Sequence, residues 1–261
     1  MPLVGAAILP HSPLLLPGLR SEIKTQVQKT TVAIHSLADE LYAREPEVLL
    51  LMAAHTATTG LSDRYAFIQA PQLPYSFAEF GDLKTQGEFK GAVGFTHRLK
   101  ERWETVFPFP LVSVKQLPYT FAVPLVVLGE PLNKLPVVCL QVPKEIPVDE
   151  IKRLALLLSE ELDIARERVV MLAAGDLAHA TTETLTESQI FDKLFCSACD
   201  QCSVDKLVNL EADLRARTRE CLWAPTTLLC ATLGECNTHM DVISYESPVG
   251  VGFLVARFDL A

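Results

Sequence analysis

Three short apolar runs lie far apart in the sequence, and each is followed closely by a histidine. The runs are residues 4–9, 48–54 and 169–174. A short, continuous apolar run bounded by turn residues predicts a fully buried strand of a parallel sheet. Because the carboxyl ends of parallel strands lie at one edge of the sheet, we expect His11, His55 and His179 to approach one another there.

The segments between these runs alternate between helical and strand patterns. Helices are expected over residues 21–44, 91–105, 148–162, most of 184–221, and 225–233. Further strands are expected over residues 111–115, 136–142, 241–245 and 251–258. Residues 60–90 are expected to form a loop with an extended piece at 65–69, and Pro124 favours a first helical turn over a strand. The alternation predicts a single three-layer α/β/α domain over residues 1–261, with a mostly parallel central sheet.

The amino-acid composition indicates which classes of binding partner to expect. The 261 residues are 49% hydrophobic, which is enough for a large core, and the formal net charge is -9 without a basic cluster. We therefore expect no nucleic acid and no membrane as the main partner. The N-terminus lacks the basic flank of a signal peptide, so a cytoplasmic protein is expected. A homodimer is the default expectation for the oligomeric state.

The seven cysteines are an odd number in a long chain, which favours reduced thiols over a disulfide framework. Cys196, Cys199 and Cys202 resemble part of an iron–sulfur motif, but the usual nearby Cys-Pro is absent. Their spacing places them near one face of a helix, where a thiol behaves as a small apolar group. A zinc site that uses Cys236 or His239 is slightly favoured over an iron–sulfur cluster, although no Cys/His pair has finger spacing.

The strand-end histidines carry the candidate chemistry. A mononuclear non-heme Fe(II) site needs two imidazoles and one carboxylate, with positions left open for substrate and O2. His11 and His55 are candidate ligands, and His179 is a candidate acid/base. Asp176 is expected either to orient an imidazole or to cap the following helix.

A structural role for these histidines is the simpler alternative. A single strand-end histidine is usually only a polar residue at the solvent boundary, but three equivalent positions favour function. The other three histidines lack this placement: His35 and His97 are expected at the surface, and His239 in a loop.

Four segments resemble a known family. They are Leu9-Pro10-His11-Ser12-Pro13, Ala53-Ala54-His55, Gly175-Asp176-Leu177-Ala178-His179, and Tyr245 through Phe253. Together they are similar to the catalytic chains, of the B type, of class III extradiol ring-cleavage dioxygenases. Within that family the chain most resembles the Memo-like branch, whose members are called AmmeMemoRadiSam system protein B. The Gly-Asp-Leu-Ala-His segment is the most specific of the four.

The resemblance implies roles for particular residues. His11 and His55 would bind Fe(II), and His179 would act as acid/base toward a catechol. The third ligand would come from Arg219-Glu220-Cys221. Glu220 matches the glutamate of the dioxygenases, whereas Cys221 followed by Pro225 matches the Memo-like pattern, and the two stay open. A thiolate would favour Zn or Cu(I) over Fe(II).

One departure from the family pattern affects the function. Many relatives carry Asp-His-Gly before Val-Pro-Leu, where this chain has Pro118-Tyr119-Thr120-Phe121-Ala122. Tyr119 supplies a hydroxyl there but no group that titrates near neutral pH. The first hypothesis is therefore an Fe(II)-dependent extradiol dioxygenase that acts on a small catechol-type aromatic and O2. The alternatives are a non-enzymatic module that binds a metal or a partner and, less favoured, a metal-dependent hydrolase.

Overall fold

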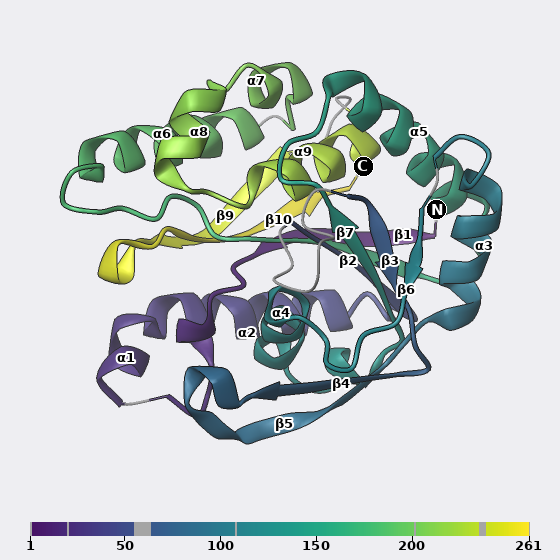
Figure 1. The fold of residues 1–261 in the computed structure, drawn as a ribbon, viewed down its shortest axis with the longest axis horizontal. Helices are drawn as coiled ribbons and strands as arrows, with labels where there is room; N and C mark the ends of the chain where they lie inside the picture. Colours follow the sequence, from purple (N-terminus) through teal and green to yellow (C-terminus); the bar gives the residue numbers. More distant parts are fainter. Residues whose placement is uncertain are drawn as a thin grey trace.

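The structure is a computed structural model, which describes residues 2–19, 21–54, 64–107, 109–200, 202–234 and 239–260. Within these residues the main sheet is built from β1 (Leu3–Leu9), β2 (Val48–Ala54), β3 (Ala66–Ile68), β6 (Leu111–Val112), β7 (Val137–Val142), β8 (Val169–Ala174), β9 (His239–Glu246) and β10 (Phe253–Asp259). Their order across the sheet is β6-β3-β7-β2-β8-β1-β10-β9. The sheet crosses the centre of the molecule with helices on both faces (Figure 1).

The centre of the sheet is parallel, which confirms the predicted fold class. Strands β7, β2, β8 and β1 pair in parallel, whereas β10 pairs antiparallel with β1 and with β9. At the other edge, β3 pairs antiparallel with β7 and parallel with β6. Every residue of β2, β7 and β8 is buried. Strands covered on both faces have no solvent side, which explains why these runs are apolar throughout and do not alternate.

The described helices are α1 (Ser21–Gln26), α2 (Gln28–Tyr42), α3 (Val93–Trp103), α4 (Tyr119–Leu128), α5 (Val148–Ile164), α6 (Leu185–Cys199), α7 (Val204–Val208), α8 (Ala212–Thr218) and α9 (Trp223–Leu233). Short 3-10 turns are η1 (Pro13–Leu15), η2 (Ala78–Phe80), η3 (Leu132–Lys134) and η4 (Pro248–Gly250). The sheet separates two hydrophobic cores. Helices α3 and α5 to α9 pack over the core on one face, and α2 and α4 pack over the core on the opposite face (Figure 1). None of the described helices combines the length and the apolar character needed to cross a membrane.

Residues 70–90 differ from the expected loop, whereas the extended piece expected at 65–69 is found as β3. Residues Gln72–Phe77 (β4) and Asp82–Lys90 (β5) pair as an antiparallel hairpin, and its turn includes Gly81 at φ 83°. Leu73, Phe77 and Phe89 are buried in the core beneath α2 and α4. The sequence does not indicate the hairpin because Pro74 and Gly87, which are unusual in strand interiors, interrupt its alternating pattern.

Two expected helices have different limits in the structure. The helix expected over 21–44 is divided at Val27, whose φ of -104° and ψ of 12° are not helical. Helix α4 begins at Tyr119, directly after the N-cap Pro118, so Pro124 lies inside the helix and not in its first turn. The earlier start of α4 matters because it places Tyr119 at the helix N-terminus, where it faces the residues described next.

Candidate active site

The ends of three parallel strands are level with one another. Ala174 of β8 pairs with Leu9 of β1 on one side and with Ala53 of β2 on the other. His11 and Asp176 each lie two residues beyond this row. Their proximity therefore follows from sheet register, because equal extensions of level strands enter the same space.

Asp176 joins the two described candidate histidines. Its Oδ1 accepts a hydrogen bond from the backbone N–H of His11 at 3.1 Å. Its Oδ2 lies 3.9 Å from Nε2 of His11 and also 3.9 Å from Nε2 of His179. The side chains of His11 and Asp176 are buried, whereas that of His179 is 39% exposed. One carboxylate oxygen thus faces both imidazoles, and of the two His179 is the one open to an approaching molecule.

The environment of Asp176 and of His179 favours the uncharged form of each side chain. Burial raises the pKa of Asp176 to about 7, although hydrogen bonds from the backbone of His11 and Ser12 oppose that rise. Burial also lowers the pKa of His179, and the positive charges of Lys144 and Arg219 lower it further. The imidazole of His179 is consequently held in its neutral form, which can accept a proton. No sequence motif identifies Lys144 or Arg219 as a residue that lowers the pKa of His179.

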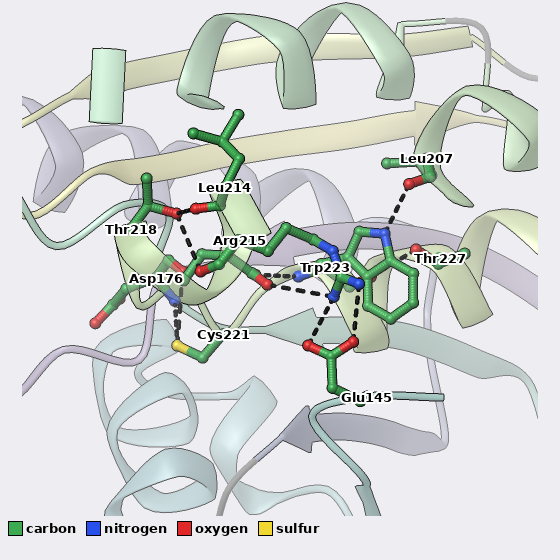
Figure 2. A network of polar contacts seen from close by, with 10 residues as sticks. Glu145, Asp176, Leu207, Leu214, Arg215, Thr218, Cys221, Trp223 and Thr227 are labelled. Atoms are coloured by element: carbon green, nitrogen blue, oxygen red, sulfur yellow. Dashed lines mark hydrogen bonds and ion pairs between the residues drawn. The ribbon is translucent and has the colours of Figure 1, made fainter. Parts of the chain in front are cut away.

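Cys221 connects His11 to the segment that carries Asp176. Its Sγ lies 3.2 Å from Nε2 of His11 and accepts a hydrogen bond from the backbone N–H of Asp176 at 3.2 Å. In return, the backbone N–H of Cys221 donates to the carbonyl of Asp176 at 3.1 Å. Figure 2 shows Cys221 beside Asp176. Burial raises the pKa of the Cys221 thiol well above its ordinary value, and the charge of Asp176 adds to that rise.

Glu220 is engaged by a different set of groups. One carboxylate oxygen accepts the backbone N–H of Trp223 at 2.8 Å, at the start of α9, and the other lies 3.9 Å from Nη1 of Arg215. Burial raises the pKa of Glu220 to about 7, against the opposing effects of Trp223 and Arg215. The guanidinium of Arg215 in turn lies between Glu145 and the ring of Trp223 (Figure 2). Of the two candidates for a third ligand, the structure places Cys221 against His11 and Glu220 in this neighbouring network.

Tyr119 lies against the same histidine from the α4 side. Its ring contacts that of His11 edge to face, with 5.8 Å between centroids. Burial, together with the charges of Cys221, Asp176 and Glu79, raises the pKa of Tyr119 to about 12. The phenol therefore stays protonated and is a hydrogen-bond donor at neutral pH.

The donor chemistry fits a metal ion with ligands of mixed hardness. Metal–nitrogen and metal–sulfur bonds of about 2.0–2.3 Å place two donors of one ion about 3–3.6 Å apart, which matches the 3.2 Å between His11 Nε2 and Cys221 Sγ. In addition, Nε2 of His179 is buried and makes no hydrogen bond within the described part of the chain. The described residues alone contain no group of three His, Cys, Asp or Glu side chains suited to a metal. His55, the remaining candidate ligand, lies outside the described residues.

The other candidate residues lie elsewhere. Cys199 and Cys202 are buried in the core beneath α5 to α9 together with Cys230, as expected for thiols that behave as apolar groups, and Cys196 is half-buried at its edge. Cys236 lies outside the described residues. His35 and His97 are exposed, as expected, whereas His239 is the first residue of β9 and pairs with Asp200.

Gly175 allows the Cys221 and Asp176 segments to approach so closely. A Cβ at this position would lie 2.6 Å from the carbonyl oxygen of Cys221 and 2.7 Å from the Cα of Leu222. Because both atoms belong to the backbone, Gly175→Ala is expected to lower the free energy of unfolding by about 1–3 kcal/mol. The measurement is urea denaturation. Gly94→Ala in α3 is the matched control, because a Cβ there has open space and no loss is expected. An equal effect of both substitutions would contradict the assignment.

Comparisons with known proteins agree with this architecture. A family model described as "Catalytic LigB subunit of aromatic ring-opening dioxygenase" matches residues 5–256. Protein CA_C1420 of Clostridium acetobutylicum is 21% identical over 99% of this chain, but the match spans only 58% of that longer protein. The crystal structure of an uncharacterized protein from Escherichia coli K12 has the same fold, with a TM-score of 0.62 and 13% identity, over 97% of this chain and 99% of that one.

Proposed function

The chain belongs to the family of catalytic LigB subunits of aromatic ring-opening dioxygenases, and from that premise we propose that it opens the ring of a catechol-type aromatic with O2. The observation that carries the proposal is the meeting of His11, Asp176 and His179 beyond the level ends of β1 and β8. A proton acceptor beside a metal-binding imidazole is the arrangement that diol activation requires.

We propose that His11, His55 and Cys221 hold the metal, with Cys221 in the place of the carboxylate of a standard non-heme Fe(II) site, and that the ion used for ring opening is Fe(II). Cys221 is preferred to Glu220 because its sulfur lies 3.2 Å from the His11 nitrogen, whereas the Glu220 carboxylate already binds Trp223 and faces Arg215. When bound, iron would supply Lewis acidity and a path for electrons between the diol and O2.

The protein's own residues would move the protons and stabilise the resulting charge. The neutral imidazole of His179 accepts a proton from a diol hydroxyl, and the Oδ2 of Asp176 stabilises the imidazolium that forms. Lys144 and Arg219 stabilise the negative charge that the diol gains, because their positive charges reach His179. Tyr119, protonated at neutral pH, supplies a hydrogen-bond donor on the α4 side.

A second candidate function is metal binding without ring opening. The observation that favours it is again Cys221, because a thiolate ligand suits Cu(I) or Zn better than Fe(II). Both candidates use the same residues, and they differ in the metal and in the consumption of O2.

Metal analysis of protein purified without oxygen tests both candidates. We expect about one ion per chain in the wild type, and at least a tenfold loss of affinity in His11→Ala and in Cys221→Ser, since each removes one donor. His35→Ala and Cys196→Ser are the matched controls and should keep the ion. Full metal content in His11→Ala would contradict the site.

The two candidates separate in an oxygen electrode. Iron-loaded protein should consume O2 when a catechol is added and form a coloured ring-opened product. Loaded protein that consumes no O2 with any diol would favour the second candidate. A preference for Cu(I) or Zn that disappears in Cys221→Ser would favour it as well.

A further inference from the structure

The segment that carries His179 lies outside the main sheet and is held from three sides. Along one side it runs beside residues 250–252: Leu177 N–H donates to the Gly252 carbonyl at 2.9 Å, and Gly252 N–H donates to the Ala178 carbonyl at 2.9 Å. Behind it, the backbone N–H of His179 donates to the carbonyl of Thr218, at the end of α8, at 2.7 Å. These contacts join backbone to backbone, so a side-chain substitution leaves their chemical groups in place.

The third side is a side chain, Asp192 of α6. Its Oδ1 accepts the backbone N–H of Ala178 at 2.9 Å, and its Oδ2 accepts the phenolic O–H of Tyr245 at 2.6 Å. Asp192 is only 4% exposed. Both carboxylate oxygens therefore accept a hydrogen bond. One bond comes from Ala178, the residue before His179, and the other comes from Tyr245 of β9 and fixes the carboxylate itself.

Asp192 packs closely against the Gly252 and Leu177 segments. A Cβ at Gly252 would lie 2.6 Å from Oδ2 of Asp192 and 2.7 Å from the Cβ of Leu177. Burial raises the pKa of Asp192, although the bonds from Tyr245 and Ala178 oppose that rise. The protein thus keeps a costly buried carboxylate at this position, where an apolar residue would fill the space but could not accept the Ala178 N–H.

We propose that Asp192, fixed by Tyr245, is a positioning residue that holds the backbone of Ala178 and thereby the imidazole of His179 against Asp176. This role goes beyond the proposed function. Helix α6 and strand β9 contribute no group to the reaction, but through Asp192 and Tyr245 they fix the position of His179. The catalytic consequence of this role rests on that proposed function.

The alternative is that Asp192 merely satisfies a buried N–H, and substitutions distinguish the two. In Asp192→Ala the Ala178 N–H loses its acceptor, and the segment gains freedom. Asp192→Asn keeps an acceptor for Ala178, while its amide donates to the Tyr245 oxygen, so it is the conservative variant. Tyr245→Phe leaves one carboxylate oxygen unpaired and should give an intermediate effect. Asp200→Ala, at the exposed end of α6, is the matched control.

The experiment combines amide hydrogen exchange with steady-state kinetics. Asp192→Ala should speed exchange at residues 177–180 at least tenfold and lower kcat at least tenfold, with metal content and KM for a catechol little changed, because binding groups stay in place. Asp192→Asn should restore most of both losses. If Asp192→Ala does not fold, the comparison between Tyr245→Phe and the wild type gives the same test with a smaller effect.

Three outcomes would overturn the proposal. They are wild-type exchange at residues 177–180 in Asp192→Ala, an unchanged kcat in that variant, or losses in Asp192→Asn as large as those in Asp192→Ala. Exchange is measured without substrate, so it does not need ring opening. Faster exchange in Asp192→Ala, in a protein whose wild type opens no ring, would support the hold of Asp192 on the backbone of Ala178 and would reject the proposed function together with the catalytic consequence of that hold.

Discussion

His179→Ala is expected to lower kcat for ring opening by about 10²–10⁴-fold while the bound metal stays in place. The imidazole of His179 is 39% exposed, faces the Asp176 carboxylate at 3.9 Å and has a pKa lowered by burial, which is why we propose it as the proton acceptor of the site. The measurements are O2 uptake at saturating catechol and metal content by elemental analysis.

The matched control for this prediction is His97→Ala, an exposed histidine of α3 paired with Glu101, which should keep full activity. Added imidazole should restore part of the lost rate in His179→Ala, because a free base can enter the space left by the side chain. Loss of the metal along with the activity would mean that His179 is a ligand and not the proton acceptor.

Arg215→Met is expected to lower the free energy of unfolding by about 3–5 kcal/mol, because it leaves a buried carboxylate without its cation. Arg215 donates to both oxygens of Glu145 at 3.0 and 2.8 Å, lies over the Trp223 ring at 3.8 Å, and faces the buried Glu220 at 3.9 Å. Urea denaturation at neutral pH gives the measurement.

Two further variants separate the causes of this loss. Arg217→Met, in the same helix, removes only a surface ion pair with Glu187 and should cost at most about 1 kcal/mol. Glu220→Gln keeps an acceptor for the Trp223 N–H without a charge, so adding it to Arg215→Met should recover part of the stability. No recovery in the double variant would show that the lost contacts with Glu145 and Trp223 account for the effect.

The fold class and most of the elements could be predicted from the sequence because long apolar runs and helical periodicity are local signals. The buried strands β2, β7 and β8 lie where continuous apolar runs predict them. The β4–β5 hairpin is not predicted, because Pro74 and Gly87 mask its alternation. The predicted start of α4 is too late, because Pro124 suggests a first turn whereas Pro118 directly precedes the helix.

The sequence indicated which residues form the candidate site, but not which of them touch one another. The strand-end pattern draws attention to His11, Asp176 and His179, and sheet register brings the first two together. The sequence does not decide whether Glu220 or Cys221 is the third ligand, because a pattern that locates a site cannot separate two adjacent residues. Their different partners are set by the Cys221–Asp176 backbone pairing and by the start of α9.

The sequence by itself determined the layered α/β architecture and the edge of the sheet toward which the candidate residues extend, because hydrophobic periodicity depends on neighbours along the chain and the carboxyl ends of parallel strands share one edge. Only the tertiary structure decided which groups touch: Cys221 with His11, Arg215 with Glu145 and Asp192 with Ala178. These pairs come from segments that are separate in the chain. Such contacts depend on how the layers pack in three dimensions, and no local pattern encodes that packing.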